Sequence, residues 1–85
     1  MENERAFEII VNVQGDVFYQ GKPMSGWELQ NTTLHEFTRF PHTVFFIKGD
    51  ENTDYEKIDA VLGILKKNHI QNVVIMAERA RNKNE

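Results

Sequence analysis

The sequence predicts an α+β two-layer sandwich, in which a small mixed sheet carries two helices on one face in the order β-β-α-β-α-β. Three observations support this fold class. The segment 7–13 alternates in the way that is typical of a strand with one buried face. Two later segments carry apolar side chains at helical spacing after capping signals. Each of them is followed by a continuous apolar run, which predicts a strand buried in a sheet.

The chain has the size of one small domain. Of its 85 residues, 40% are hydrophobic and 27% are charged, which is ordinary for a folded domain. We predict a flexible segment over 1–6, a single domain over 7–78 and a flexible tail over 79–85. The lack of cysteine excludes a disulfide framework, a thiolate metal site and a cysteine nucleophile. The net charge of −3 argues against a nucleic-acid-binding surface.

The first half of the domain begins with a predicted β-hairpin. The strand 7–13 leads into a turn in which Gly15 is free to adopt positive φ, and 17–19 forms the second strand. A second turn follows over 20–23, where Pro23 prevents further ladder pairing on its side. The short second strand leaves a sheet edge, whose unpaired N–H and C=O groups can add a strand from a partner or from a second copy.

The first helix begins at a capping signal. Ser25 and Glu28 have the spacing of a capping box, in which the hydroxyl and the carboxylate bind backbone N–H groups at the helix start. We expect the helix to end before Pro41, which disfavours helical backbone in the residue that precedes it. The expected inward face, with the tryptophan as a core anchor, consists of Trp27, Leu34 and Phe37.

The second half is predicted to be a parallel, right-handed β-α-β crossover. Its first strand spans 43–47 and is expected to be covered on both faces. Thr53 and Glu56 fit a second capping box, and Asn68 can take the left-handed position after the helix. The last strand is expected over 73–77, again buried.

The loop before the second helix carries the most distinctive polar residues. Asp50, Glu51 and Asp54 cluster there and admit two interpretations. They form either an acidic recognition loop or weak cation site, or a turn that also places negative charge at the positive end of the helix, and we favour the turn. Tyr55 heads the apolar stripe of the helix and is expected to lie in the core with its hydroxyl in water.

The sequence suggests no catalytic set, and we expect neither an enzyme nor a cofactor. His35, His42 and His69 lack the spacing of metal ligands, so no metal site is expected. Ser25 has no evident His and Asp partners for nucleophilic catalysis.

The order and the amino-acid sequences of these segments resemble those of the periplasmic domain of the ExbD/TolR family. The resemblance covers roughly residues 8 to 78, nearly the whole chain. The first half matches the family's strand, glycine turn, short strand and Lys-Pro entry to a helix, in the words IIVNVQGDVFYQGKPMS. The second half matches a strand that closes with Asp, a helix that starts with Tyr, and a last strand, in the words TVFFIKGD, DYEKIDAVLGILKKNHI and NVVIMAE.

The resemblance implies a function in energy transduction between two membranes. Members are inner-membrane proteins that have one transmembrane helix and assemble with an ExbB/TolQ-like channel protein. This chain would be the periplasmic domain, which helps couple proton-motive force to TonB- or TolA-dependent outer-membrane transport or integrity. It would act by dimerisation and by binding a TonB- or TolA-like protein, and TolR-type domains add peptidoglycan as a partner. Asp50, Asp54 and Tyr55 match the family pattern and are the candidate partner-binding residues.

Two departures qualify the resemblance. The family's proton-carrying Asp lies in its transmembrane helix, and no residue of this chain matches it, so we expect a soluble fragment of a longer protein. The turn after the second helix has Asn68-His69 where glycine is common in the family. Asn tolerates the left-handed conformation, so the turn can form.

Two other interpretations remain open from the sequence. The chain would be a freestanding cytoplasmic protein-interaction module if Met1 is the natural start. A small enzyme would need a polar pocket with perturbed titratable groups, for which the sequence offers no set of residues. An apolar segment of about 20 residues with one Asp, encoded upstream, would favour the family over both.

Overall fold

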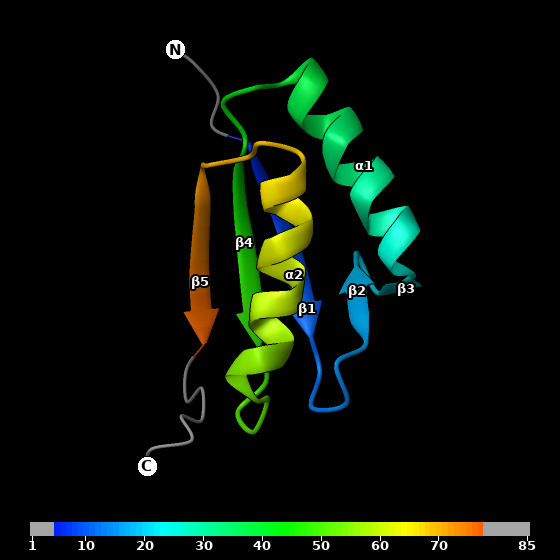
Figure 1. The fold of residues 1–85 in the computed structure, drawn as a ribbon, viewed down its shortest axis with the longest axis vertical. Coiled ribbons are helices and arrows are strands. Elements are labelled where there is room, and N and C mark those ends of the chain that lie inside the picture. The colour runs from blue at the N-terminus through cyan, green and yellow to red at the C-terminus, as the bar shows by residue number, and fades with distance from the viewer. Residues whose placement is uncertain (1–4, 78–85) are drawn as a thin grey trace.

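The computed structural model, which describes residues 5–77, contains a five-stranded mixed sheet and two helices (Figure 1). This confirms the predicted α+β class and the predicted succession of strands and helices. The strand order across the sheet is β3-β2-β1-β4-β5. The elements are β1 (Ala6–Val11), β2 (Val17–Tyr19), β3 (Lys22–Met24), α1 (Gly26–Arg39), β4 (Val44–Gly49), α2 (Tyr55–Lys67) and β5 (Val73–Ala77).

The sheet combines a parallel and an antiparallel half. β1 pairs with β4 and β4 with β5 in parallel, so the crossover through α2 joins parallel strands as predicted. β2 pairs with β1 and with β3 in antiparallel fashion. The three-residue β3 lies where the sequence predicted only a turn, because Pro23 sits opposite Phe18 in an edge strand, which tolerates a missing N–H donor.

Both helices lie on one face of the sheet, and the core fills the space between (Figure 1). Alternate residues of the two central strands point into this core and are buried. They pack against apolar side chains of both helices. The core consists of Phe7, Ile9, Val11, Phe45, Ile47, Leu29, Ile58, Val61, Leu65 and Ile70.

Two expectations about burial were wrong. β4 was expected to be covered on both faces, but only Phe45 and Ile47 are buried and the other four residues of the strand are half-buried. β5 was expected to be a buried strand, but it lies at the sheet edge, and Val74 and Met76 are 43% and 46% exposed. Both differences arise because the helices cover one face alone.

Helix α1 starts as predicted but turns a different face inward. The capping box is present, since the Glu28 N–H donates to Ser25 Oγ at 3.0 Å and the Ser25 N–H donates to Glu28 Oε1 at 2.8 Å. Trp27, the expected core anchor, is 74% exposed and Leu34 is exposed as well, whereas Phe37 packs against the core as predicted. Leu29 and Thr33 are buried in place of Trp27, because the Thr33 hydroxyl donates to the Leu29 carbonyl at 2.8 Å and so enters the interior with its hydrogen bond satisfied.

Helix α2 begins and ends differently from the prediction. Its N-cap is Asp54, without a side-chain capping bond, so the expected Thr53–Glu56 capping box is absent. Thr53 is buried, and its hydroxyl donates to the Val11 carbonyl at 3.2 Å. The left-handed residue after the helix is His69, with φ of 62°, while Asn68 is the C-cap. The His69 N–H donates to Lys66 O at 2.9 Å and closes the turn.

A buried polar contact joins the two helices. The Asn68 amide donates to the Gln30 carbonyl and to Thr33 Oγ1, both at 3.0 Å. Asn68 is 7% exposed and Thr33 is fully buried. The end of α2 is therefore hydrogen-bonded to the middle of α1, and the bond to Thr33 is buried.

A second polar cluster ties the start of β1 to the end of α1. Arg5 Nε donates to Glu36 Oε2 at 2.9 Å and lies over the Phe40 ring at 3.6 Å. The buried Thr43 hydroxyl donates to the same Glu36 oxygen at 2.7 Å. Of the predicted flexible segment 1–6, Arg5 and Ala6 are described, and Ala6 opens β1. The remainder of that segment, and the predicted tail 79–85, lie outside the described residues.

The interhelical contact predicts a specific loss of stability. We expect Asn68→Ala to lower the free energy of unfolding by about 1–3 kcal/mol, because it removes two hydrogen bonds between the helices, one of them to the buried Thr33 hydroxyl. The backbone of Asn68, at φ −88° and ψ 5°, accepts alanine without strain. Urea denaturation followed by circular dichroism would measure the change. The matched control is Asn31→Ala on the exposed side of α1, which we expect to be neutral or slightly stabilising. Equal losses in both variants would contradict the role of Asn68.

The Glu36 cluster predicts a pH dependence of stability. Hydrogen bonding to Arg5, aided by Thr43, lowers the pKa of the Glu36 carboxyl although burial opposes this. A carboxyl whose pKa is lower in the folded state stabilises the fold above its unfolded pKa, and this contribution disappears as pH falls through the folded pKa. Glu36→Gln keeps an oxygen for the Thr43 hydroxyl but removes the charge. We expect it to be less stable than wild type at pH 7, with the difference narrowing below about pH 4. A difference in unfolding free energy that stays constant from pH 7 to pH 3 would refute this role of the charge.

Candidate partner-binding surfaces

The three candidate residues taken from the sequence lie together at the start of α2. The Asp50 N–H donates to the Val11 carbonyl at 3.1 Å, and the Asp50 carbonyl accepts from the Thr53 N–H at 3.0 Å. These bonds fix the loop between β4 and α2 at the end of β1. The side chains of Asp50, Asp54 and Tyr55 remain exposed, and Tyr55 is 47% exposed although it was expected in the core.

The absence of a capping bond leaves the Asp54 carboxylate free to face solvent. It lies at the positive end of α2, where Glu56 adds a second negative charge in the first turn. Among residues 5–77, no group of three or more His, Asp or Glu side chains is placed to hold a metal ion. The weak cation site considered for this loop therefore gains no support from the described part of the chain. The loop exposes three carboxylate residues, Asp50, Glu51 and Asp54, beside the Tyr55 ring.

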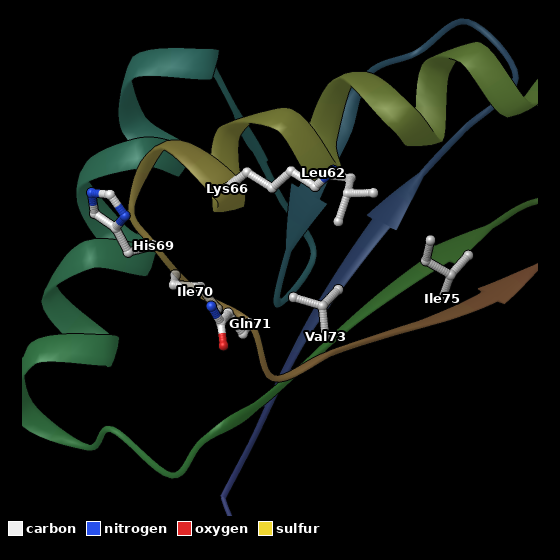
Figure 2. Close-up of a pocket in the computed structure, with 7 residues that line it drawn as sticks. All are labelled: Leu62, Lys66, His69, Ile70, Gln71, Val73 and Ile75. Carbon is white, nitrogen blue, oxygen red and sulfur yellow. The ribbon is translucent and has the colours of Figure 1, made fainter.

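A groove at the opposite end of α2 was not anticipated from the sequence. It lies between the C-terminal half of α2 and strand β5, and it encloses about 500 Å³. Figure 2 shows Val73 and Ile75 pointing from β5 toward α2, with Leu62 and Lys66 above them on the helix. The lining residues are Leu62, Lys66, His69, Ile70, Gln71, Val73 and Ile75.

The groove opens along the free edge of β5. The Phe45 N–H donates to the Asn72 carbonyl at 2.9 Å, and Phe45 is opposite Val73 in the parallel register. In a parallel ladder this pattern directs the N–H and C=O groups of Val74 toward β4 and those of Ile75 away from it. Ile75 thus presents a backbone donor and acceptor at the edge beside the groove.

The two edges of the sheet differ in their fitness to accept a further strand. The edge strand β3 has three residues and contains Lys22 and Pro23, which hinder strand addition. The edge strand β5 has five residues, Val73–Ala77, with neither proline nor charge. The sequence predicted an available edge at the first hairpin, whereas the structure offers the better one at β5. Knowledge of the strand order would have been needed to find it.

The remaining candidate residues do not assemble into a site. His35 and His42 are exposed near α1, whereas His69 lines the groove at the end of α2. Ser25 is occupied as the N-cap of α1. Within residues 5–77, no helix is long and apolar enough to cross a lipid bilayer.

Because the Asp54 carboxylate makes no capping bond, we expect substitution of the N-cap residue to destabilise the protein less at α2 than at α1. We expect Asp54→Ala to cost about 0.3–0.5 kcal/mol, because it removes a charge from the helix dipole but breaks no capping bond. Ser25→Ala breaks the capping box and should cost about 1 kcal/mol. Thermal or urea unfolding of the two variants provides the comparison. A larger loss in the Asp54 variant would show that its carboxylate has a structural role.

Comparison with known proteins adds no relative to this description. No model of a protein family matches the chain, and no curated protein matches it. The resemblance to the ExbD/TolR family stays a prediction from the sequence alone. In the fold, the sequence segments on which this resemblance rests include the β1–β2 turn, the entry to α1 through β3, and the connection from β4 to α2.

Proposed function

We propose that this chain is the periplasmic domain of an ExbD/TolR-like inner-membrane protein. Such a protein helps couple proton-motive force to TonB- or TolA-dependent outer-membrane transport or integrity, together with an ExbB/TolQ-like channel protein. The domain acts by dimerisation and by binding partners, and it catalyses no reaction. The ordered sequence resemblance supports the family, and the free edge of β5 beside the groove supports the mode of binding.

The edge of β5 is the observation that carries the proposal. An extended segment of a TonB- or TolA-like protein pairs with β5 and hydrogen-bonds to the outward N–H and C=O of Ile75. These bonds supply affinity without regard to sequence. They also satisfy backbone groups that otherwise depend on water.

The groove adds selectivity to this pairing. Side chains alternate across a strand, so every second residue of the added segment points toward α2. Those side chains enter the space bounded by Leu62, Val73 and Ile75, which are apolar. Lys66 and His69 at the end of the groove favour a segment that carries an acidic residue there.

The second surface, formed by Asp50, Asp54 and Tyr55, is assigned to a partner by resemblance and by exposure. It lies at the N-terminal end of α2, whereas the groove lies at the C-terminal end. One partner segment of ordinary length would not cover both. We assign the edge of β5 to the TonB- or TolA-like segment and the loop surface to contacts within the larger assembly.

The strand-addition proposal predicts a localised response to a peptide. The isotope-labelled domain is titrated with a synthetic peptide from the periplasmic linker of a TonB- or TolA-like protein. We expect the backbone amide of Ile75 to shift more than that of Val74, because only the former points to the edge. Absence of any shift along β5 at about 1 mM peptide, a concentration that detects even millimolar affinities, would reject strand addition.

A matched pair of variants separates backbone pairing from side-chain packing. Ile75→Pro removes the outward N–H, and edge strands tolerate proline. Ile75→Ala loses comparable packing but keeps that N–H. We expect the proline variant to bind the peptide at least tenfold more weakly than the alanine variant, which is the effect of about 1.4 kcal/mol. Circular dichroism confirms that both remain folded. Equal affinities would show that the edge N–H is not used.

A further inference from the structure

The sheet face that points away from the helices is apolar where a face exposed to water is normally polar. Side chains alternate along each strand, so the residues between the buried ones lie on this open face. Neither α1 nor α2 covers it (Figure 1). Two of these residues are charged, Glu8 and Lys48. The others are Ala6, Ile10, Phe18, Pro23, Val44, Phe46, Val74 and Met76. A sheet with one solvated face ordinarily alternates between apolar residues inside and polar residues outside.

Elsewhere the chain does place charges on its solvated surfaces. The outer side of α2 carries Glu56, Asp59 and Lys67, all exposed. On the open sheet face, by contrast, Val74 and Met76 are nearly half exposed, and Phe46 and Ile10 are half-buried because neighbouring side chains shield them. A contiguous patch of this kind marks a surface that a macromolecule covers.

The rest of this chain does not offer the side chains to cover it. The sequences outside the described range, MENE and ERARNKNE, contain only Met1 and Ala80 as apolar residues. A lipid surface would be favoured by an excess of basic residues, but the face has one acidic and one basic side chain. The partner must therefore be apolar over most of its surface and balanced in charge.

A second copy of the same face meets both conditions. Glu8 Oε1 and Lys48 Nζ lie 4.0 Å apart near the middle of the face, on the adjacent strands β1 and β4. When two such faces meet about a two-fold axis, Glu8 of one copy can approach Lys48 of the other, and each contact occurs twice. We infer that the open sheet face binds the same face of a second copy, with the Glu8–Lys48 pair setting the alignment.

The size of the face limits the strength of this contact. Three strands of five to six residues and two strands of three residues, at a spacing of about 4.8 Å, give the sheet a flat area of about 350 Å². The buried surface then falls at the low end of specific interfaces, so we expect a dissociation constant between about 10 µM and 1 mM. A family of domains held on membrane anchors would reach such concentrations locally.

The inference rests on the proposed function, in which the domain dimerises, and it names the surface that does so. It leaves the edge of β5 open, because two sheets that pack face to face use side chains and not the backbone groups of their edges. The dimer and the strand addition can therefore coexist, and each can fail without the other.

Sedimentation equilibrium from 10 µM to 1 mM tests the dimer. We expect wild type to dimerise in this range and Met76→Lys to weaken the dimer at least tenfold. The matched control is Leu34→Lys, which alters a residue of similar exposure on α1, away from the sheet face. Wild type that stays monomeric at 1 mM overturns the inference, as does an equal effect of the two variants.

A charge-exchange pair tests the alignment of the two copies. We expect Glu8→Lys and Lys48→Glu each to dimerise more weakly than wild type, because each brings like charges together across the axis. Mixed in equal amounts, the two variants should form a heterodimer at least as tight as wild type. A mixture that associates no better than its components overturns the alignment.

One further measurement separates this inference from the proposed function. Glu8→Lys changes β1 and leaves β5 intact, so it should bind the linker peptide as wild type does. Loss of the dimer with retained peptide binding supports the inference and the strand addition together. A wild-type dimer that ignores the peptide rejects strand addition alone, whereas a monomer that binds it rejects the sheet-face dimer alone.

Discussion

The parallel pairing of β1 with β4 is the contact on which the rest of the structure depends. It places the start of β1 beside the segment that joins α1 to β4, and the end of β1 beside the loop that joins β4 to α2. At the start, Arg5 meets Glu36 at the end of α1, and at the far end the Val11 carbonyl accepts from the Asp50 N–H at 3.1 Å and the Thr53 hydroxyl at 3.2 Å. Those bonds aim α2 back across the sheet, where Asn68 joins it to α1.

One consequence of this arrangement is that the molecule is built on a single covered face. Both crossovers return on the same side, so β5 ends at an edge and the other sheet face stays open (Figure 1). The edge offers backbone groups beside an apolar groove, and the face offers side chains. Two different kinds of contact, strand pairing and face packing, are thereby available on surfaces that do not compete.

Features that depend on neighbouring residues could be predicted from the sequence, whereas features that depend on contacts between distant residues could not. The Ser25–Glu28 capping box and the bounds of the last strand depend on a few adjacent residues, and both were predicted correctly. Trp27 was wrongly placed inside, because hydrophobicity alone favours it over Thr33, whose buried hydroxyl bonds locally to the Leu29 carbonyl and also accepts from Asn68, 35 residues away. Thr53 was wrongly made a cap, since its partner is the Val11 carbonyl across 42 residues. The groove and the open face required the strand order, which no local pattern encodes.

Packing also explains the sequence of the loop that carries Asp50, Asp54 and Tyr55. A Cβ on Gly49 would lie 2.8 Å from Ile58 Cδ1, so glycine lets α2 approach the end of β4 closely. The backbone of Asp50 and the hydroxyl of Thr53 then bind Val11, and Asp54 caps the helix by position alone. Backbone bonds and packing thus account for the spacing, while the side chains of Asp50, Asp54 and Tyr55 take no part in them. Asp54 also adds its charge to the positive end of α2, and the exposure of all three side chains is the ground on which we propose a contact within a larger assembly.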